Sequence, residues 1–278
     1  MKAFPYQAAN YEYKGAALET QWARLHRGDC EPYPALVTVK ELVAAYPDLK
    51  PKIPLGQAAQ ALQAAWRAFH HGEFEGAEEQ GLEIGRLGFN VANRAANIRA
   101  TYLESAKRNK FSIFLQSARR AEELQRHAPG LPNAWYLHAQ ALGRRAQGLS
   151  IVDALVQGVA GKVKASLDKT LELEPDHADA HIALGLYHAE VIEKVGALVG
   201  GLTYGATRDA SVKHFEKALK LNSASAIARV EYAEALKMMF GGDKAAHITR
   251  LLNQAAQSTP ADAMERLDIE LARTKLED

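Results

Sequence analysis

Residues 135–223 contain the same pattern of helical positions twice in tandem, and this repetition restricts the fold more than any other feature of the chain. The first copy contains Trp135, Ala139, Leu142, Leu167, Thr170, Leu171 and Pro175. The second copy contains His181, Leu184, Gly185, Tyr187, Phe215, Ala218, Leu219 and Ser223. The copies are offset by 46 residues at their start and 48 at their end. Such a period is typical of stacked helical units, which offer surfaces to partners rather than one catalytic cleft.

The composition agrees with an all-α protein, because alanine is abundant and β-branched residues are sparse. The longest apolar run, residues 195–202, is far shorter than the roughly 20 residues that span a bilayer, so no membrane span is predicted. The first seven residues lack the apolar segment and cleavage site of a signal peptide, so a cytoplasmic location is expected. The single cysteine, Cys30, excludes an internal disulfide.

The first 56 residues differ from the rest in their proline content and form an expected N-terminal helical cap. Apolar residues at helical spacing predict short helices over 16–27 and 36–46. A longer helix is predicted from residue 57 to about 70, and Gly72 separates it from another over 75–87. The prolines that divide the cap are Pro5, Pro32, Pro34, Pro47, Pro51 and Pro54.

The helical hairpin around Gly72 resembles the middle of a tetratricopeptide repeat. In that family a glycine turns the chain, an aromatic residue packs under it and an alanine allows close helix contact. The matching residues are Trp66, Gly72, Glu73, Phe74 and Ala77. The resemblance implies a right-handed α-solenoid over residues 57–260 with a C-terminal capping helix over 261–278. The implied helix pairs are residues 57–89, 90–129, 130–175, 176–223 and 224–260.

The pairs 130–175 and 176–223 are longer than the family norm and carry related apolar inserts. The sequence Ala-Leu-Val-Gln-Gly at residues 154–158 corresponds to Ala-Leu-Val-Gly-Gly at residues 197–201. In this respect the chain resembles the regulators of microtubule dynamics and the T component of bacterial TRAP transporters. Because exposed apolar residues are costly in water, we expect the inserts to be buried in the array, to mediate self-association or to bind an apolar ligand.

The net charge of +1 conceals an uneven distribution. Residues 86–145 contain 11 Lys or Arg against three Glu, a net charge of +8, and the remainder of the chain has a net charge of −7. This basic middle could attract an acidic peptide or protein or pair with the acidic end of a neighbouring copy, or it could be an ordinary solvated helix face. Nucleic acid is not expected, because no recognised nucleic-acid motif accompanies the basic residues.

Asparagine recurs at helical spacing at residues 90, 93 and 97, although it is a poor interior helix former. The structural alternative is that Asn90 or Asn93 is a helix N-cap. In tetratricopeptide arrays, the first helix of each pair lines a concave groove where Asn and basic side chains hold a bound peptide. The resemblance therefore suggests these groove residues: Asn93, Arg94, Asn97, Tyr102, Tyr136, Gln140, Arg144 and Tyr232. The family's lysine–asparagine carboxylate clamp is not recognisable.

Other constellations favour structure over chemistry. His177, His181 and His188 lie at helical spacing that could bring imidazoles to one metal, but packing is the preferred interpretation. His70 and His71 precede Gly72, where imidazolium can interact with the last helix carbonyls. No nucleophile–base pair, complete metal motif or phosphate-binding loop is present, so neither an enzyme nor a cofactor is expected.

The sequence thus predicts a non-catalytic scaffold that binds an acidic or extended segment of another protein in a concave groove. The alternative is a carrier of an apolar small molecule, or a transporter accessory protein, that uses the Ala-Leu-Val inserts.

Overall fold

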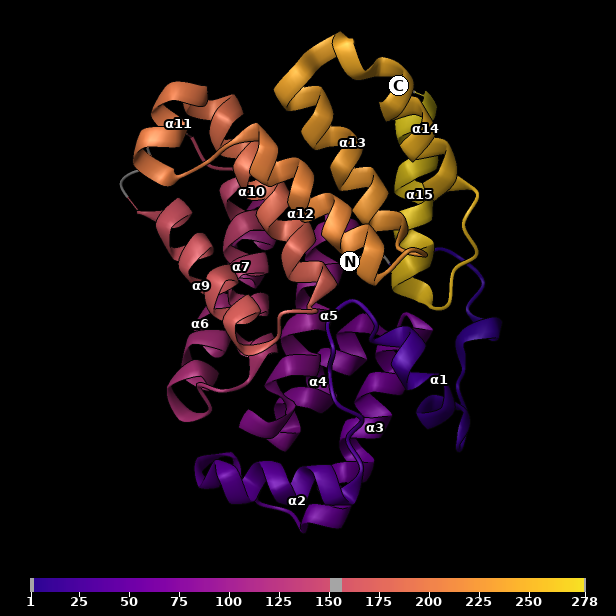
Figure 1. The fold of residues 1–278 in the computed structure, drawn as a ribbon. Coiled ribbons are helices and arrows are strands. Elements are labelled where there is room, and N and C mark those ends of the chain that lie inside the picture. Colours follow the sequence, from indigo (N-terminus) through magenta and orange to yellow (C-terminus); the bar gives the residue numbers. More distant parts are fainter. Residues whose placement is uncertain (1–2, 151–156, 278) are drawn as a thin grey trace. The chain divides into compact units, whose positions relative to one another are not determined.

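A computed structural model describes residues 3–150 and 157–277 of the chain, and these residues form α-helices joined by turns and short 3-10 segments (Figure 1). No β-strand occurs within those two ranges. The all-α prediction is confirmed, and the right-handed tetratricopeptide-type solenoid stays a prediction. Two compact units divide the chain: unit 1 comprises residues 1–26, 31–148 and 262–264, and unit 2 comprises residues 27–30, 149–261 and 265–278. The predicted division into an N-terminal cap, a repeat array and a closing helix stays a prediction.

The predicted N-terminal helices of unit 1 are confirmed as α1 (Ala17–Leu25) and α2 (Leu36–Ala45). They are accompanied by 3-10 turns at Ala9–Tyr11 and Pro47–Leu49. Leu49 is almost fully buried in a cluster with residues of α6 and of the turn that follows it. This burial anchors the N-terminal part of unit 1 to its helical hairpins.

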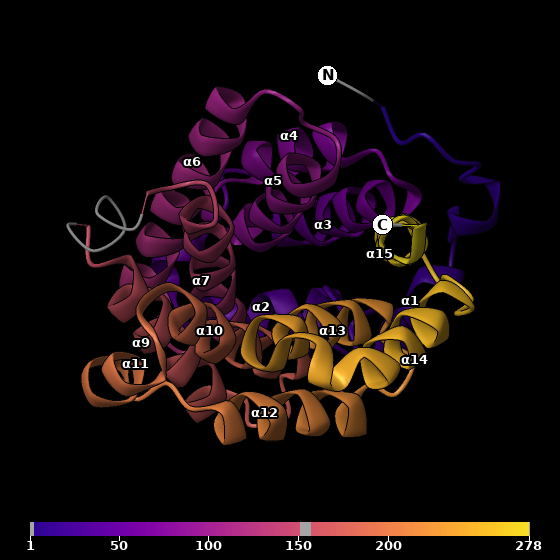
Figure 2. The same ribbon diagram turned by 90° about the horizontal axis from the view of Figure 1, so that it is seen from above.

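The body of unit 1 is a succession of antiparallel helices, each packed against the next in sequence (Figures 1 and 2). Both predicted helices around Gly72 are confirmed, although the second ends at residue 84, before Gly85. Gly72 has a φ of +96° and its amide bonds the Phe69 carbonyl, as expected for a glycine that ends a helix. The helices are α3 (Leu55–His71), α4 (Phe74–Ile84), α5 (Phe89–Tyr102), α6 (Lys107–His127) and α7 (Pro132–Ala146).

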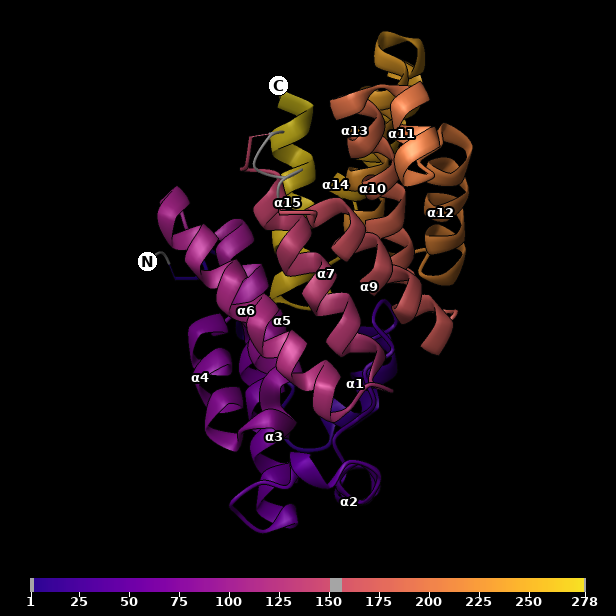
Figure 3. The same ribbon diagram turned by 90° about the vertical axis from the view of Figure 1, so that its left-hand side faces the viewer.

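Unit 2 contains the second tandem copy and the helices that follow it (Figure 3). Three of its helices begin with a side-chain cap: the side chains of His177, Thr207 and Ser225 each accept a hydrogen bond from the amide three residues ahead. The helices are α9 (Val159–Leu173), α10 (Ala178–Val195), α11 (Ala197–Tyr204), α12 (Arg208–Leu221), α13 (Ala226–Phe240), α14 (Ala245–Ala256) and α15 (Ala263–Glu277), whose first two residues belong to unit 1.

Gly185 and Phe215, two positions of the repeated pattern, hold α10 and α12 together. A Cβ atom added at Gly185 would lie 2.6 Å from the Phe215 ring, and Phe215 has no exposed surface. The glycine is therefore needed for close packing rather than for an unusual backbone conformation. These two positions, which mark the second copy in the sequence, are contact positions in the structure.

The inserts can be followed in one copy. Residues 197–201 open the short helix α11, which packs against α10. Residues 154–156 of the other insert lie outside the described residues.

Candidate functional site

Helix α5, which carries the asparagines, is the buried centre of unit 1. Every residue from Asn90 to Ala100 is buried, and the alanines among them let neighbouring helices approach closely. Gly88 is the N-cap residue, so the alternative that Asn90 or Asn93 caps the helix is wrong. Burial among other helices explains why α5 forms despite the low helix propensity of asparagine.

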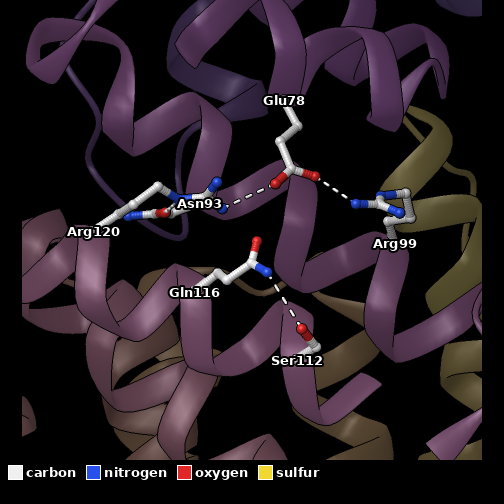
Figure 4. Close-up of polar contacts among 6 residues, drawn as sticks. All are labelled: Glu78, Asn93, Arg99, Ser112, Gln116 and Arg120. Atoms are coloured by element: carbon white, nitrogen blue, oxygen red, sulfur yellow. Dashed lines mark hydrogen bonds and ion pairs between the residues drawn. The ribbon is translucent and has the colours of Figure 1, made fainter. Parts of the chain in front are cut away.

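A polar network connects α5 to α4 and α6 (Figure 4). Glu78 on α4 accepts from Nη2 of Arg99 at 2.5 Å and from Nη2 of Arg120 at 3.0 Å. The Nε atom of Arg120 donates to the side-chain oxygen of Asn93 at 2.8 Å. The side chains of Glu78, Arg99 and Arg120 are 11–14% exposed, so these charges interact in a largely desolvated environment. This network holds α6 in position against α4 and α5.

Two further asparagine contacts connect α5 to other parts of unit 1. Asn97 donates to the Gln140 side chain at 2.9 Å, and Gln140 donates to the Tyr136 hydroxyl at 3.2 Å. Asn90 donates to the Glu31 carboxylate at 3.1 Å, as does Asn133 on α7 at 2.6 Å. Of the predicted groove residues, the structure thus brings together Asn97, Gln140 and Tyr136.

Asn93, Arg94 and Asn97 are buried, with exposed fractions of 0%, 4% and 0%. Such side chains contact a ligand only if neighbouring side chains move. Within the described residues, however, Asn93 Nδ2 and Asn97 Oδ1 have no hydrogen-bond partner, which leaves capacity for another bond. Their predicted role in ligand binding stays a prediction.

The remaining predicted groove residues lie on α5, α7 and α13. Arg94 lies over the Phe69 ring, 5.9 Å from its centroid. Tyr102 and Arg144 are partly exposed at the C-terminal ends of α5 and α7. Tyr232 belongs to unit 2, where it is buried and stacks on Phe215 at a centroid distance of 4.9 Å. Burial raises the pKa of Tyr232.

The outer face of α6 carries exposed cations that the sequence analysis did not single out. We call residues Arg108, Ser112, Gln116, Arg119 and Arg126 the α6 stripe; all are exposed and lie on one side of the helix. Within the described residues, none of the three arginines has a carboxylate partner. The helix's own carboxylates are occupied elsewhere, because Glu122 pairs with His138 and Glu123 with Arg86.

A second unusual surface is the apolar face of α11 in unit 2. Leu198, Val199 and Leu202 are 77%, 49% and 82% exposed. Gly200 is the buried residue of this helix, and it faces Val191 of α10. The expectation that this insert is covered by unit 2 itself therefore does not hold for these three side chains. Self-association through residues 197–201 stays a prediction.

Histidines occupy two buried clusters. His177 is the N-cap of α10, while His181 and His188 lie with His214 in unit 2. In the part of the chain that the structure describes, no group of three or more His, Cys, Asp or Glu side chains has a geometry that could hold a metal ion.

The second cluster lies in unit 1 and corrects the interpretation of His70 as a residue that caps the last helix carbonyls. His70 is 1% exposed, and its Nδ1 atom lies 2.7 Å from the Asp262 carboxylate. Its Nε2 atom lies 3.2 Å from Nε2 of His26. The hydrogen-bonded series Asp262–His70–His26 fixes residues 262–264 to the rest of unit 1. Because Asp262 and His70 are 192 residues apart, no local sequence pattern predicts their contact.

A cavity of about 400 Å³ lies at the turn between α3 and α4 of unit 1. Phe4, Tyr6 and Phe74 supply its aromatic walls, while Glu73 and Arg99 supply charges of both signs. The Glu78 network reaches this cavity through Arg99. Because its lining carries charges of both signs, the cavity favours neither an anionic nor a cationic ligand.

None of the helices within residues 3–150 and 157–277 combines the length and hydropathy needed to cross a bilayer. Comparison with protein-family models and with curated proteins found no match to this chain.

Proposed function

We propose that the protein is a non-catalytic helical scaffold whose α6 stripe binds an acidic, extended segment of another protein. The observation that carries the proposal is the row of three exposed arginines without carboxylate partners among the described residues. The resemblance to tetratricopeptide arrays supports a binding role. The buried Glu78 network supports it further, since it fixes the helix that presents the row.

The dimensions of the stripe define the ligand. Arg108 and Arg126 are 18 residues apart, which corresponds to about 27 Å along a helix. An extended peptide rises about 3.3 Å per residue, so a segment of about eight residues covers this distance. Ser112 and Gln116 lie between the arginines and hydrogen-bond each other at 3.3 Å. Their polar groups can bond a peptide backbone, while the arginines attract its carboxylates.

Single-stranded nucleic acid is the less suitable ligand. Its binding sites combine cations with aromatic rings on which bases stack. The aromatic residue nearest the start of the stripe, Phe111, is only partly exposed, and the side chains of Lys107 and Arg145 lie over its ring. The α6 stripe therefore has the charge for such a ligand without the stacking surface.

The test is the fluorescence anisotropy of a labelled octaglutamate peptide at low ionic strength. The variant Arg108→Glu/Arg119→Glu/Arg126→Glu is expected to bind at least about tenfold more weakly than the wild type, because exposed ion pairs contribute about 0.2–1 kcal/mol each and the new carboxylates repel the peptide. Added salt is expected to weaken wild-type binding.

The matched control is Lys40→Glu/Lys50→Glu/Lys52→Glu, which changes the net charge equally at three exposed lysines of unit 1. The proposal fails if the control weakens binding as much as the stripe variant does. It also fails if octaglutamine binds as well as octaglutamate, or if a single-stranded oligonucleotide binds more tightly than the peptide and competes with it.

The exposed face of α11 favours a second candidate function, in which the protein carries an apolar small molecule. If it does, mass spectrometry under native conditions of gently extracted protein should find a stoichiometric ligand, and Leu198→Ser/Leu202→Ser should reduce its occupancy. A preparation that contains no ligand, or equal occupancy in the variant, would exclude this candidate and leave the scaffold.

A further inference from the structure

Three histidines of unit 2 lie between α10 and α12, where His214 contacts both His181 and His188. His181 and His188 are seven residues apart on α10 and are 9% and 5% exposed. His214 on α12 places its Nδ1 atom 2.9 Å from Nδ1 of His181, and its ring stacks on His188 at a centroid distance of 5.8 Å.

The hydrogen bonds define which ring nitrogens carry protons. The Nε2 atom of His181 lies 3.2 Å from the Pro175 carbonyl, which only accepts, so Nε2 of His181 is protonated. In the neutral ring its Nδ1 then accepts from Nδ1–H of His214. The Nδ1 atom of His188 accepts from the amide of Thr207 at 3.3 Å, so His188 carries its proton on Nε2. The observed contacts are thus satisfied by three neutral imidazoles.

We propose that His181, His188 and His214 form a proton-sensitive latch that closes α12 onto α10 when the rings are neutral and loosens on acidification. When His181 and His214 are both protonated, two N–H groups would face each other at their contact. A proton on Nδ1 of His188 would break its bond to the Thr207 amide. Both changes act on the interface between the two helices.

The surroundings offer the protonated rings little compensation. The charged groups that act on them are Lys164 and Asp168 of α9, Asp176 of the preceding turn and Lys217 of α12. These groups pair with each other, Lys164 with Asp168 at 2.6 Å and Lys217 with Asp176 at 3.1 Å. The other packed helices contribute phenols: Tyr204 of α11 lies by Tyr187 of α10, and Tyr232 of α13 stacks on Phe215, beside His214 in sequence.

The direction of the pH effect follows from the protonation states. Burial and the two neighbouring imidazoles lower the pKa of His214 to about 4, and burial lowers the pKa of His181 and His188. In the open helix pair these groups titrate near 6.5. The open pair therefore binds more protons, so the latch is fully stable above about pH 6.5 and is weakened as the pH falls toward 4. Each such histidine changes the opening equilibrium by up to about tenfold per pH unit.

The latch also controls the anchorage of α11. Thr207, which donates to His188, follows directly after the α11 segment and is the N-cap of α12. Release of this bond removes one contact beside the C-terminal end of the helix that exposes Leu198 and Leu202, where the Tyr187 hydroxyl also donates to the Tyr204 carbonyl. Acidification would thus change how the apolar face of α11 is presented, independently of the α6 stripe.

The test compares hydrogen-exchange protection factors at pH 7.5 and 5.5. In the wild type, the protection factors of α10 and α12 are expected to fall by at least about tenfold at the lower pH. In His214→Asn, whose amide can retain the donor to His181, the fall should be up to about tenfold smaller. The matched control, His127→Asn, removes an imidazole of unit 1 that pairs with Asp48 and should leave the fall unchanged. An equal fall in His214→Asn, or no fall in the wild type, would overturn the latch.

A second test uses only the wild-type protein, so it does not depend on whether His214→Asn folds normally. Imidazole ¹⁵N chemical shifts at pH 7.5 should identify the Nε2–H tautomer for His181 and the Nδ1–H tautomer for His214. Charged rings at that pH, or Nε2–H tautomers for both residues, would contradict the latch.

Discussion

Glu78→Ala is expected to destabilise unit 1 by about 3–5 kcal/mol, because the substitution leaves two buried guanidinium groups without their shared carboxylate. Arg99 and Arg120 each bond one oxygen of Glu78, and because both are cations, neither can supply the missing negative charge to the other. Loss of the network should also weaken the attachment of α6, since Arg120 and Asn93 would keep only the bond between themselves.

Tryptophan fluorescence during urea unfolding measures this effect selectively. The three tryptophans, Trp22, Trp66 and Trp135, all belong to unit 1. The control is Glu79→Ala, which removes an exposed carboxylate from the adjacent position and should change the free energy of unfolding by no more than about 0.5 kcal/mol. Equal, small effects of the two variants would show that the Glu78 network contributes nothing to the stability of unit 1.

Gly185→Ala is expected to destabilise unit 2 by about 1–3 kcal/mol, although alanine is the better helix former. The new Cβ would lie within 2.6 Å of the Phe215 ring, so α10 and α12 must separate or the ring must leave its buried position. In α7, Gly143 provides the matched control, because a Cβ there meets no atom within 4 Å. Gly143→Ala should therefore stabilise its unit by about 0.5–1 kcal/mol.

Hydrogen exchange of α10 and α12 measures the effect of Gly185→Ala on the stability of unit 2. Tryptophan fluorescence during urea unfolding measures the effect of Gly143→Ala on the stability of unit 1. The two glycine substitutions should have opposite signs. If Gly185→Ala is as stabilising as Gly143→Ala, the contact between Gly185 and Phe215 does not determine the packing of this helix pair.

Local sequence patterns predicted much of the helical framework. The helices over 16–27, 36–46 and around Gly72 were expected from apolar spacing and helix-ending residues, and the structure confirms them. These signals act within a few residues, so they can be read without knowledge of tertiary contacts. The contact between Gly185 and Phe215 gives the tandem pattern a direct physical meaning.

The surroundings of the asparagines were less accessible to prediction. Asn93 and Asn97 were assigned to a groove because their residue type is unusual in a helix, but that signal does not distinguish a ligand-binding face from a buried polar network. The partners that distinguish the two are Arg120 and Gln140, which lie 27 and 43 residues further along the chain. Likewise, His181 and His214 are separated by 33 residues and share no sequence motif.

The sequence showed that basic residues gather in the middle of the chain, but it did not show which of them are buried and which are exposed. Arg94 and Arg99 are buried, whereas Arg108, Arg119 and Arg126 are exposed. The spacing of the exposed arginines along one side of α6 was available in the sequence as a polar stripe at helical period. The structure adds that both carboxylates of the same helix pair with residues other than these arginines.

The most direct test of the proposed binding function is an NMR titration of the wild-type protein with octaglutamate, followed through backbone amide shifts. The α6 stripe predicts saturable changes concentrated between Arg108 and Arg126, with little change at the control lysines Lys40, Lys50 and Lys52. Saturable changes that avoid α6, or no saturable change at low ionic strength, would contradict the assignment of this helix as the binding surface.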